Sequence, residues 1–507
     1  MTTLAALPAL ITPAGSDIVG LLPEVILGGA FVALMMLDLV TKPAQRGWLA
    51  AFSVVAVAAS FGATVWGWFD AASATTEHTV YSGSFAYDRF GLFINAIILL
   101  STALVLVISP QYLNRRGIHY GEYYALILGA ATGMMLLAGA SSLMVIFLAI
   151  ELLSIALYIL SGFNRTEPRS QEAAMKYLLL GGFASGFLLF GMALIYGETG
   201  HTQLAPIAAA LQNGTGTVDP LLMAGIALLF VGLAFKISAA PFHTWTPDVY
   251  QGAPTSVTTF MSVTTKVAAF AALIRVFSYT LGETNVYDKW KVMVFFVAIA
   301  SMVIGNVAAL QQRSVKRMLG YSGIAQAGYI LIGVVVLSPA ATWGALYYLA
   351  SYAAANIGAF AVITIMAARG EDLDGYDGLR GLAFRRPYVA ASMGLFLLSL
   401  GGFPPTAGFF GKFFVFKAAV EGGQVPLALW GIATSAVSVF YYLRVALLMY
   451  QRPQPDEPTY NWSRTSLAGG TVLALTAAGT LFMGIFVAVV LNIAIAAQHG
   501  NAITGAL

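Results

Sequence analysis

The sequence contains no cysteine, and only 9% of its 507 residues carry a charge. The missing thiols exclude iron–sulfur ligation, cysteine-bound zinc and disulfide bonds within this chain. A soluble domain carries roughly 25% charged residues, so this chain has too few of them for a water-facing surface. Its net charge of +3 gives no indication of a nucleic-acid partner. We therefore expect the lipid bilayer to be its main surroundings.

The sequence also lacks the motifs of nucleotide, metal and nucleophile chemistry. It has no dinucleotide fingerprint, no HExxH and no Ser/His/Asp cluster. The run from Gly408 to Lys412 has part of the spacing of a phosphate loop, but Phe413 stands where that loop needs Ser or Thr. We therefore expect no cofactor or metal to be bound by this chain, and no redox centre in it.

Long apolar runs are abundant, because 59% of the residues are apolar and the mean hydropathy is +0.81. A helix that crosses a bilayer needs about 20 mainly apolar residues. The sequence therefore predicts an all-α polytopic membrane protein with about fourteen transmembrane helices. The predicted spans are 18–40, 48–68, 90–110, 124–140, 143–162, 174–196, 221–239, 255–280, 289–311, 318–337, 341–368, 388–418, 425–450 and 465–497. Only Ser141 and Ser142 separate the fourth span from the fifth.

The basic residues of the predicted loops lie mostly on one side of the membrane. Fifteen lysines and arginines fall in the loops after odd-numbered spans and three in the others. Cytoplasmic loops are enriched in these residues. The bias predicts that the N-terminus lies outside, on the side of the membrane opposite the cytoplasm. The loop after the seventh span has no lysine or arginine, and we expect it to fold back into the protein.

Two of the predicted spans are broken by proline. Pro241 follows the seventh span, and the run from Gly401 to Pro405 interrupts the twelfth. Lys236 precedes the first break whereas Lys412 follows the second, as expected for two inverted repeats of five helices, spans 4–8 and 9–13. We expect one integral membrane domain, 1–507. Its predicted parts are a three-helix region 1–122, a first repeat 123–280, a second repeat 281–450 and a C-terminal helix 451–507.

Four charged residues lie deep inside predicted spans: Glu151, Lys236, Lys266 and Lys412. A charge at the bilayer centre costs at least ~2.5–3.5 kcal/mol, so such residues are usually retained for ion movement or for pairing. Each of the four is either a structural ion-pair partner or part of a proton relay, and their number favours the relay. His243 is equally compatible with a satisfied buried histidine and with a proton carrier. We expect Arg275 to be an interfacial anchor.

Lysines and a carboxylate have the chemistry that a proton relay requires. Desolvation makes a lysine release its proton more readily, and a carboxylate about 4 Å away favours the charged form again by ~4 kcal/mol at an effective dielectric of ~20. Moving one charge across 100 mV costs ~2.3 kcal/mol, so one such contact is comparable with the work of pumping. Whether the four groups line up is a matter for the structure.

At these residues the chain resembles the antiporter-like membrane subunits of respiratory complex I, the proton-translocating NADH–quinone oxidoreductase. The resemblance covers all fourteen spans. It is carried by the run PFHTWTPDVYQGAP from Pro241 to Pro254, by Glu151, and by the lysines of spans 7, 8 and 12. Within this family the chain is most similar to the subunit N group, on the sequence LLPE near its start, lysines in both spans 8 and 12, and an end soon after span 14.

The resemblance implies a role for each matched residue. Glu151 would set the charge state of Lys236, Lys266 would pass the proton to the second half, and Lys412 would connect to the outer side. It also implies that NADH, FMN, the iron–sulfur clusters and the quinone belong to other subunits. The implied partners are other complex I membrane subunits, including another antiporter-like subunit and small membrane subunits.

Two other functions are compatible with the same pattern. A subunit of a multisubunit cation/proton antiporter shares the lysines without electron transfer. A structural subunit, whose buried charges only pair with one another, is the third possibility. Co-purification with flavin and iron–sulfur subunits would distinguish a complex I subunit from an antiporter subunit. Charge-removing substitutions at Lys236 and Glu151 that leave pumping normal would favour the structural subunit.

Overall fold

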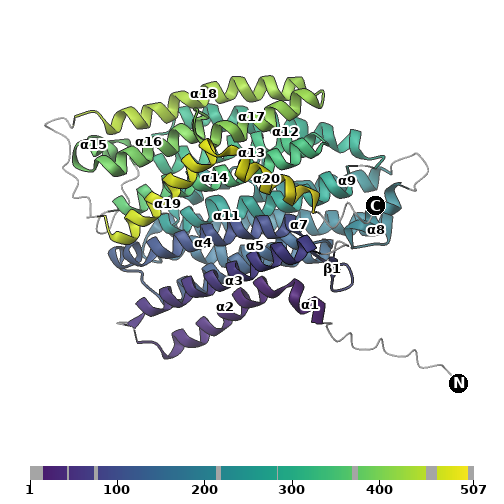
Figure 1. The fold of residues 1–507 in the computed structure, drawn as a ribbon, viewed down its shortest axis with the longest axis horizontal. Coiled ribbons are helices and arrows are strands. Elements are labelled where there is room, and N and C mark those ends of the chain that lie inside the picture. The colour runs from purple at the N-terminus through teal and green to yellow at the C-terminus, as the bar shows by residue number, and fades with distance from the viewer. Residues whose placement is uncertain are drawn as a thin grey trace.

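The computed structural model describes residues 15–42, 45–73, 78–212, 219–282, 284–367, 375–452 and 465–500. Residues 1–14 lie outside this part of the chain. Nearly all the helices run side by side along one direction, which is the arrangement of a membrane bundle (Figure 1). The fold is all-α apart from one short hairpin, which confirms the predicted fold class.

The predicted spans all appear as helices, but the fourteenth, predicted as one helix over 465–497, divides at Phe486 into Leu467–Ile485 and Val487–His499. Twelve helices in the described residues are long and apolar enough to cross a membrane. They are α2 Leu22–Val40, α3 Gly47–Ser73, α4 Arg89–Arg116, α5 Gly121–Gly139, α6 Leu143–Ser161, α7 Pro168–Thr199, α11 Thr255–Leu273 with its π-helical extension η2 Ile274–Thr280, α12 Tyr287–Leu310, α13 Val315–Val335, α14 Pro339–Met366, α18 Val425–Met449 and α19 Leu467–Ile485. The remaining two of the fourteen spans are the broken ones.

Each broken span consists of two short helices. The seventh is α9 Pro220–Lys236 followed by α10 Trp245–Gly252, and the twelfth is α16 Pro387–Gly401 followed by α17 Ala407–Glu421. As predicted, α10 folds back into the protein. Trp245 is 2% exposed, stacks on the ring of Tyr177 at 4.4 Å and donates its indole N–H to Phe235 O.

Several helix starts follow from side-chain capping. Ser314, Ser338 and Ser466 each accept a hydrogen bond from a backbone N–H of the first turn of α13, α14 and α19. Asp219 caps α9 in the same way, and a proline follows it at the first helical position. Both features satisfy or remove the orphan donors at a helix start.

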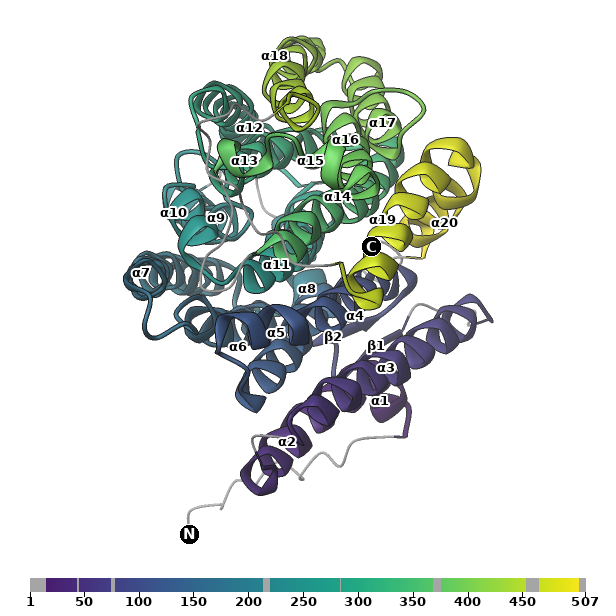
Figure 2. The ribbon, with the colours of Figure 1, turned by 90° about the vertical axis from the view of Figure 1, so that its left-hand side faces the viewer.

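The two five-helix halves meet at the centre of the bundle. Viewed end-on, α11 and α14 lie in the middle, whereas α2 and α3 stand apart on one side and α19 lies on a flank with α20, Val487–His499 (Figure 2). All the residues of α11 are buried, and so are most of those of α14. Both central helices carry side chains that take part in the polar contacts described below.

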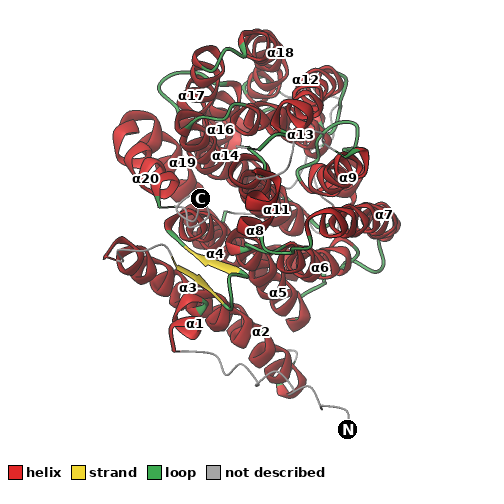
Figure 3. Cartoon of the chain, turned by 90° about the vertical axis from the view of Figure 1, so that its right-hand side faces the viewer, coloured by secondary structure: helices red, strands yellow, loops and turns green. Residues whose placement is uncertain are grey.

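Short elements on the loops were not predicted. A hairpin of β1, His78–Val80, and β2, Phe85–Tyr87, lies beside α3 and α4 (Figure 3). The helix α8, Leu204–Gln212, follows α7. The link between α5 and α6 forms one β-bridge with the hairpin, Ala140 with Phe85, and one with the residue before α8, Ser142 with Gln203. The remaining short helices are α1 Gly15–Gly20, η3 Tyr376–Leu379 and α15 Leu382–Arg385.

The prediction that Arg275 is an interfacial anchor is wrong. Its side chain is 0% exposed and forms a two-pronged ion pair with Asp88, with Nη1–Oδ2 at 2.9 Å and Nη2–Oδ1 at 2.7 Å. Its Nε donates to Ala138 O at 2.7 Å. The pair lies between the start of α4 and η2. A buried arginine needs such a partner, because an isolated charge in a dry interior is strongly unfavourable.

We expect Asp88→Asn to destabilise the protein by ~3–5 kcal/mol, because it leaves the Arg275 guanidinium buried without its counter-ion. Asparagine caps a helix about as well as aspartate, so the cap of α4 at Gly91 N is retained. Thermal unfolding of the purified protein in detergent measures the effect. Asp288→Asn is the control, since that side chain is 88% exposed in its pair with Lys291. Equal unfolding temperatures for the two variants would contradict the prediction.

Candidate functional site

Lys236 is one of the four charged residues predicted to form the site. It is the last residue of α9 and is 2% exposed. Its Nζ donates to Ser154 Oγ on α6 at 2.7 Å. The same nitrogen lies 5.6 Å and 5.4 Å from the ring centroids of Tyr158 and Tyr177. Aromatic faces attract cations. A hydroxyl and two rings therefore hold the ammonium group inside the bundle.

Glu151 lies on the same side of α6 as Ser154, one turn earlier, and accepts a hydrogen bond from Ser185 Oγ at 2.5 Å. The expectation that it is buried is only partly met, since the residue is half-buried. The reason is the position of α6 at the edge of the bundle, where Leu148 and Ile155 are 60% and 56% exposed. Among the described residues Glu151 and Lys236 form no ion pair, and Ser154 contacts the lysine instead.

Lys266 lies in the middle of α11 and is 2% exposed. Its Nζ donates to Gly323 O on α13 at 2.6 Å, and it lies 5.8 Å from the ring centroid of Tyr352 on α14. This lysine therefore sits where the two halves of the chain meet.

The Gly323 position requires the absence of a side chain. A Cβ atom there would lie 2.6 Å from Lys266 Nζ and 3.2 Å from Tyr352 Oη. We expect Gly323→Ala to displace the ammonium group and to lower coupled activity about fivefold or more, since a misplacement of ~1 Å can cost far more than that. Gly394→Ala is the control, because nothing lies within 4 Å of a Cβ built there. The measurement is the activity that the resemblance to complex I subunits implies, the rate of NADH-driven proton uptake by membrane vesicles.

A set of polar side chains connects the neighbourhood of Lys266 to that of Lys412. Ser322, the residue before Gly323, shares a short hydrogen bond with Tyr442 Oη. Gln326, one turn further along α13, donates to Tyr442 Oη at 3.2 Å and to Leu400 O at 3.0 Å. Tyr348 Oη donates to Gln326 Oε1. Leu400 is the residue before Gly401, whose carbonyl Lys412 contacts, so this polar thread runs from a chain neighbour of the Lys266 contact to a chain neighbour of the Lys412 contact. Among the described residues, hydrogen bonds join the thread to neither lysine.

Lys412 is on α17 and is 4% exposed. Its Nζ donates to Gly401 O at 3.1 Å and to Ser435 Oγ at 2.8 Å, and lies 5.0 Å from the ring centroid of Tyr329. The break in the twelfth span frees the Gly401 carbonyl for this contact. Lys412 also lines a groove of about 630 Å³ between α17 and α18, which brings this buried lysine close to an open surface of the second half.

The polar contacts continue beyond Lys412. Tyr329 Oη accepts from Asn306 Nδ2 at 2.9 Å and donates to Thr434 Oγ1 at 3.3 Å. Tyr441 Oη donates to Asn306 Oδ1 at 3.0 Å. Sequence reasoning missed these tyrosines, serines and amides, because residues of these types are common in helices and no local spacing marks those that face one another.

Within the first half, Lys236 and Lys266 are connected less directly. In the described part of the chain, side-chain hydrogen bonds do not close the path from Lys236 to Lys266, although α9 packs against α11. Two buried hydroxyls beside these lysines in the sequence, Ser238 Oγ and Thr265 Oγ1, have no hydrogen-bond partner there. Buried polar atoms are normally satisfied, so water is the expected partner at this point.

His243 lies in the break between α9 and α10 and is half-buried. Its Nδ1 has no hydrogen-bond partner among the described residues, and the structure does not bring it into contact with the four charged residues. Both interpretations of His243 therefore stay open.

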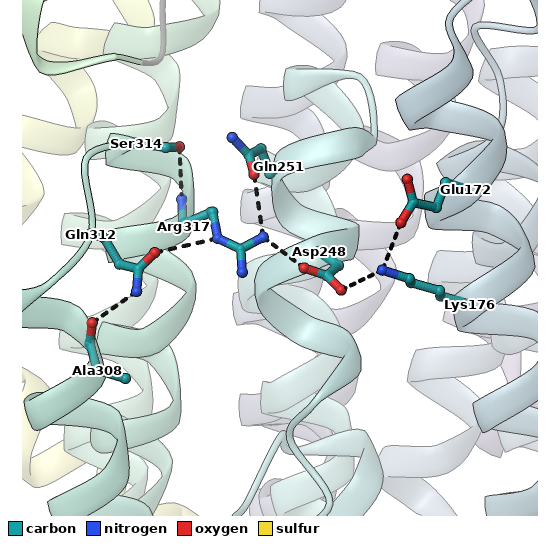
Figure 4. Close-up of polar contacts among 8 residues, drawn as sticks. All are labelled: Glu172, Lys176, Asp248, Gln251, Ala308, Gln312, Ser314 and Arg317. Carbon is teal, nitrogen blue, oxygen red and sulfur yellow. Dashed lines mark hydrogen bonds and ion pairs between the residues drawn. The ribbon is translucent and has the colours of Figure 1, made fainter.

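An ion-pair network that we did not predict is centred on Asp248 in the first turn of α10 (Figure 4). Asp248 Oδ2 accepts from Lys176 on α7 and Asp248 Oδ1 from Arg317 on α13, both at 2.6 Å. Glu172 also pairs with Lys176, at 2.7 Å. Asp248 therefore connects α10 to both halves of the chain. One indication of this network was present in the sequence: Asp248, in the run PDVY from Pro247 to Tyr250, is an acidic residue for which we predicted no partner.

The described residues hold no group of three or more histidine or acidic side chains that would bind a metal ion. Fold and site together define a polytopic membrane protein with two broken helices and a row of buried lysines. The family described as NADH:quinone oxidoreductase/Mrp antiporter, TM, matches residues 140–438. The chain belongs to this family of membrane subunits.

Individual relatives cover nearly the whole chain. A protein of Trichlorobacter lovleyi named NADH-quinone oxidoreductase subunit N is 43% identical over 94% of this chain and 95% of its own length. A chain of respiratory complex I from Thermus thermophilus with bound aureothin matches with a TM-score of 0.77 and 33% identity, over 93% of this chain and 98% of that one. A chain of the Mrp complex from Dietzia matches in fold, with a TM-score of 0.80, 21% identity and coverage of 95% and 96%.

Proposed function

We propose that this chain is a proton-translocating membrane subunit of an NADH–quinone oxidoreductase. Electron transfer from NADH to quinone takes place in other subunits, and this chain couples it to proton movement through Glu151, Lys236, Lys266 and Lys412. The observation that carries the proposal is the set of hydrogen-bonded polar side chains, Ser322, Gln326, Tyr348 and Tyr442, that lies between the surroundings of Lys266 and those of Lys412. The subunit N names of the relatives support the assignment to this enzyme.

The contacts of each lysine suit the exchange of a proton. Lys236, Lys266 and Lys412 are each held by neutral oxygen atoms and an aromatic ring, and none of the three has a carboxylate within ion-pair distance in the described residues. A lysine in such a site gains and loses its proton more easily than one locked in an ion pair. Glu151, at the edge of the bundle, is the acid whose charge shifts the balance at Lys236.

The orientation follows from the loop charges. With the basic loops in the cytoplasm, the N-terminus is periplasmic, and the membrane is the inner membrane of a bacterium. We assign the parts as the sequence suggests: 1–122 before the repeats, 123–280 and 281–450 as the repeats, and 451–507 as the C-terminal helix. Two of the fifteen basic residues counted in the cytoplasmic loops, Arg369 and Arg464, lie outside the described residues.

The partners follow from the same assignment. NADH, FMN, the iron–sulfur clusters and the quinone bind to partner subunits, in agreement with a sequence that has no cysteine. The neighbours in the membrane are another antiporter-like subunit and small membrane subunits. Exposed apolar side chains on α6 and α7, such as Phe183 at 70%, suit contact with lipid or with such a neighbour.

The runner-up is a subunit of a multisubunit cation/proton antiporter, which the shared fold of the Mrp chain favours. Purification of the tagged chain in mild detergent distinguishes the two. We expect flavin and iron–sulfur subunits to co-purify with it, together with NADH–quinone reductase activity. Recovery with small membrane subunits alone, and no flavin, would favour the antiporter.

A further inference from the structure

A groove of about 670 Å³ lies between α16 and α19, which pack against one another on the flank of the bundle (Figure 2). Apolar side chains supply most of its walls, among them Val389 and Leu395 of α16 and Leu473 and Ala477 of α19. None of the described residues that line it is acidic, and the four charged residues of the candidate site lie elsewhere. The groove is therefore a feature separate from that site.

One end of the groove is basic. Arg385 and Arg386 line it where α16 begins, and Arg386 Nη1 donates to Thr465 Oγ1, just before α19, at 2.9 Å. A guanidinium group carries five N–H donors in a planar fork, so it can hold a phosphate beside its other contacts. Both helices also begin at this end, and helix N-termini favour anions. This end of the groove therefore suits a phosphate group.

The groove reaches only part of the way across a membrane. Its lining on α16 runs from Pro387 to Leu395, which at 1.5 Å per residue is ~12 Å. The hydrocarbon core of a bilayer is ~30 Å thick, so the chains of one leaflet cover ~15 Å. A spanning helix from a partner subunit would need a groove along the whole thickness. The length of the groove matches the tail of one lipid.

Exposed aromatic side chains mark the level of the basic end. Tyr388 is 88% exposed and Phe384, in α15, is 59% exposed. Aromatic residues, tyrosine and tryptophan above all, gather where a membrane meets water, since their rings are apolar and their polar groups reach the headgroups. The two arginines next to Tyr388 therefore lie at the level of the lipid headgroups, and the apolar part of the groove lies at the level of the acyl chains.

We propose that this groove binds an anionic phospholipid of the cytoplasmic leaflet, with its phosphate held by Arg385 and Arg386 and one acyl chain lying between α16 and α19. Basic pockets between membrane helices on the cytoplasmic side are typical sites for anionic headgroups. The bound lipid fastens the C-terminal helix to the second half of the chain, because its tail contacts both. The inference depends on the membrane setting and on the orientation given by the loop charges, and not on the proton relay.

Native mass spectrometry of the full chain in mild detergent, supplied with phosphatidylglycerol or with phosphatidylcholine, tests the site. We expect the chain to retain one phosphatidylglycerol in preference to phosphatidylcholine. Arg385→Gln combined with Arg386→Gln should lower this retention about tenfold or more, because each basic group at the surface favours an anionic lipid. Arg444→Gln combined with Arg452→Gln is the control, since these two exposed arginines lie at the same end of the molecule but belong to the end of α18.

A second variant tests the position of the acyl chain. Ala474→Phe fills the groove from α19 and should lower phosphatidylglycerol retention by a similar factor. Leu475→Phe is its control, because Leu475 is 57% exposed on the same helix and does not line the groove. Normal retention in Ala474→Phe or in the Arg385 and Arg386 variant overturns the site, and so does equal binding of the two lipids by the unaltered chain.

A photo-crosslinker at position 474 in the assembled complex distinguishes a lipid from a protein occupant. We expect it to label phospholipid. Crosslinking to a partner subunit instead would overturn the proposal, since a protein would then cover the groove. Each of these failures leaves the proposed function untouched, because none of the altered residues belongs to the proton relay.

Discussion

Replacing Lys236 by alanine should lower proton-coupled quinone reduction about tenfold or more while the complex still assembles. Lys236 contacts Ser154, and in the proposed relay it carries the proton between Glu151 and the centre of the bundle. Losing a positioned proton-transfer group typically costs a factor of 10² or more. Where chemistry elsewhere limits the rate, the observed loss is smaller. Quinone reductase activity and proton uptake are measured together on the same vesicles.

Lys236→Arg should be nearly as damaging. Arginine keeps the positive charge, but its guanidinium does not release a proton at physiological pH. The comparison therefore separates a structural charge, which arginine would supply, from a group that must exchange its proton. Lys291→Met, which removes a lysine from a surface pair with Asp288, is the control for loss of one positive charge. Full activity of Lys236→Arg would support the structural interpretation of the buried charges.

The helices of this protein were predictable because the bilayer imposes one simple requirement. A run of about 20 apolar residues has few alternatives in lipid. Even the division of the fourth and fifth spans at Ser141 and Ser142 is confirmed, with α5 ending at Gly139 and α6 beginning at Leu143. The breaks were equally visible, since proline cannot continue a helix ladder.

The contacts between helices were not predictable to the same extent. Arg275 was assigned to an interface because it lies near the end of a span, but its partner Asp88 lies 187 residues away in the sequence. Ser322 and Tyr442 are separated by 120 residues. Charged residues stand out in an apolar sequence, whereas a serine facing a tyrosine does not. The sequence therefore indicated the four charged groups and not the neutral side chains that lie between them.

Lys412→Met should lower proton uptake about tenfold or more, as we expect for Lys236→Ala. This lysine lies where the polar thread of the second half meets the groove between α17 and α18. Without its ammonium group, a proton that reaches Gln326 and Tyr442 has no carrier to take it onward. Methionine fills a similar volume, so we expect the helices to stay packed and the complex to be recovered in normal amount.

The neighbouring Lys417 provides a strict control for this experiment. It lies on the same helix, five residues on, and lines the same groove, but its side chain is 53% exposed in a pair with Glu421. An exposed pair of this kind contributes little to stability. Lys417→Met should therefore pump normally, which would show that position within the thread, and not the loss of a lysine from α17, decides the outcome. Equal loss in both variants would mean that charge on this surface matters for contact with a neighbour, and the relay would have to end before Lys412.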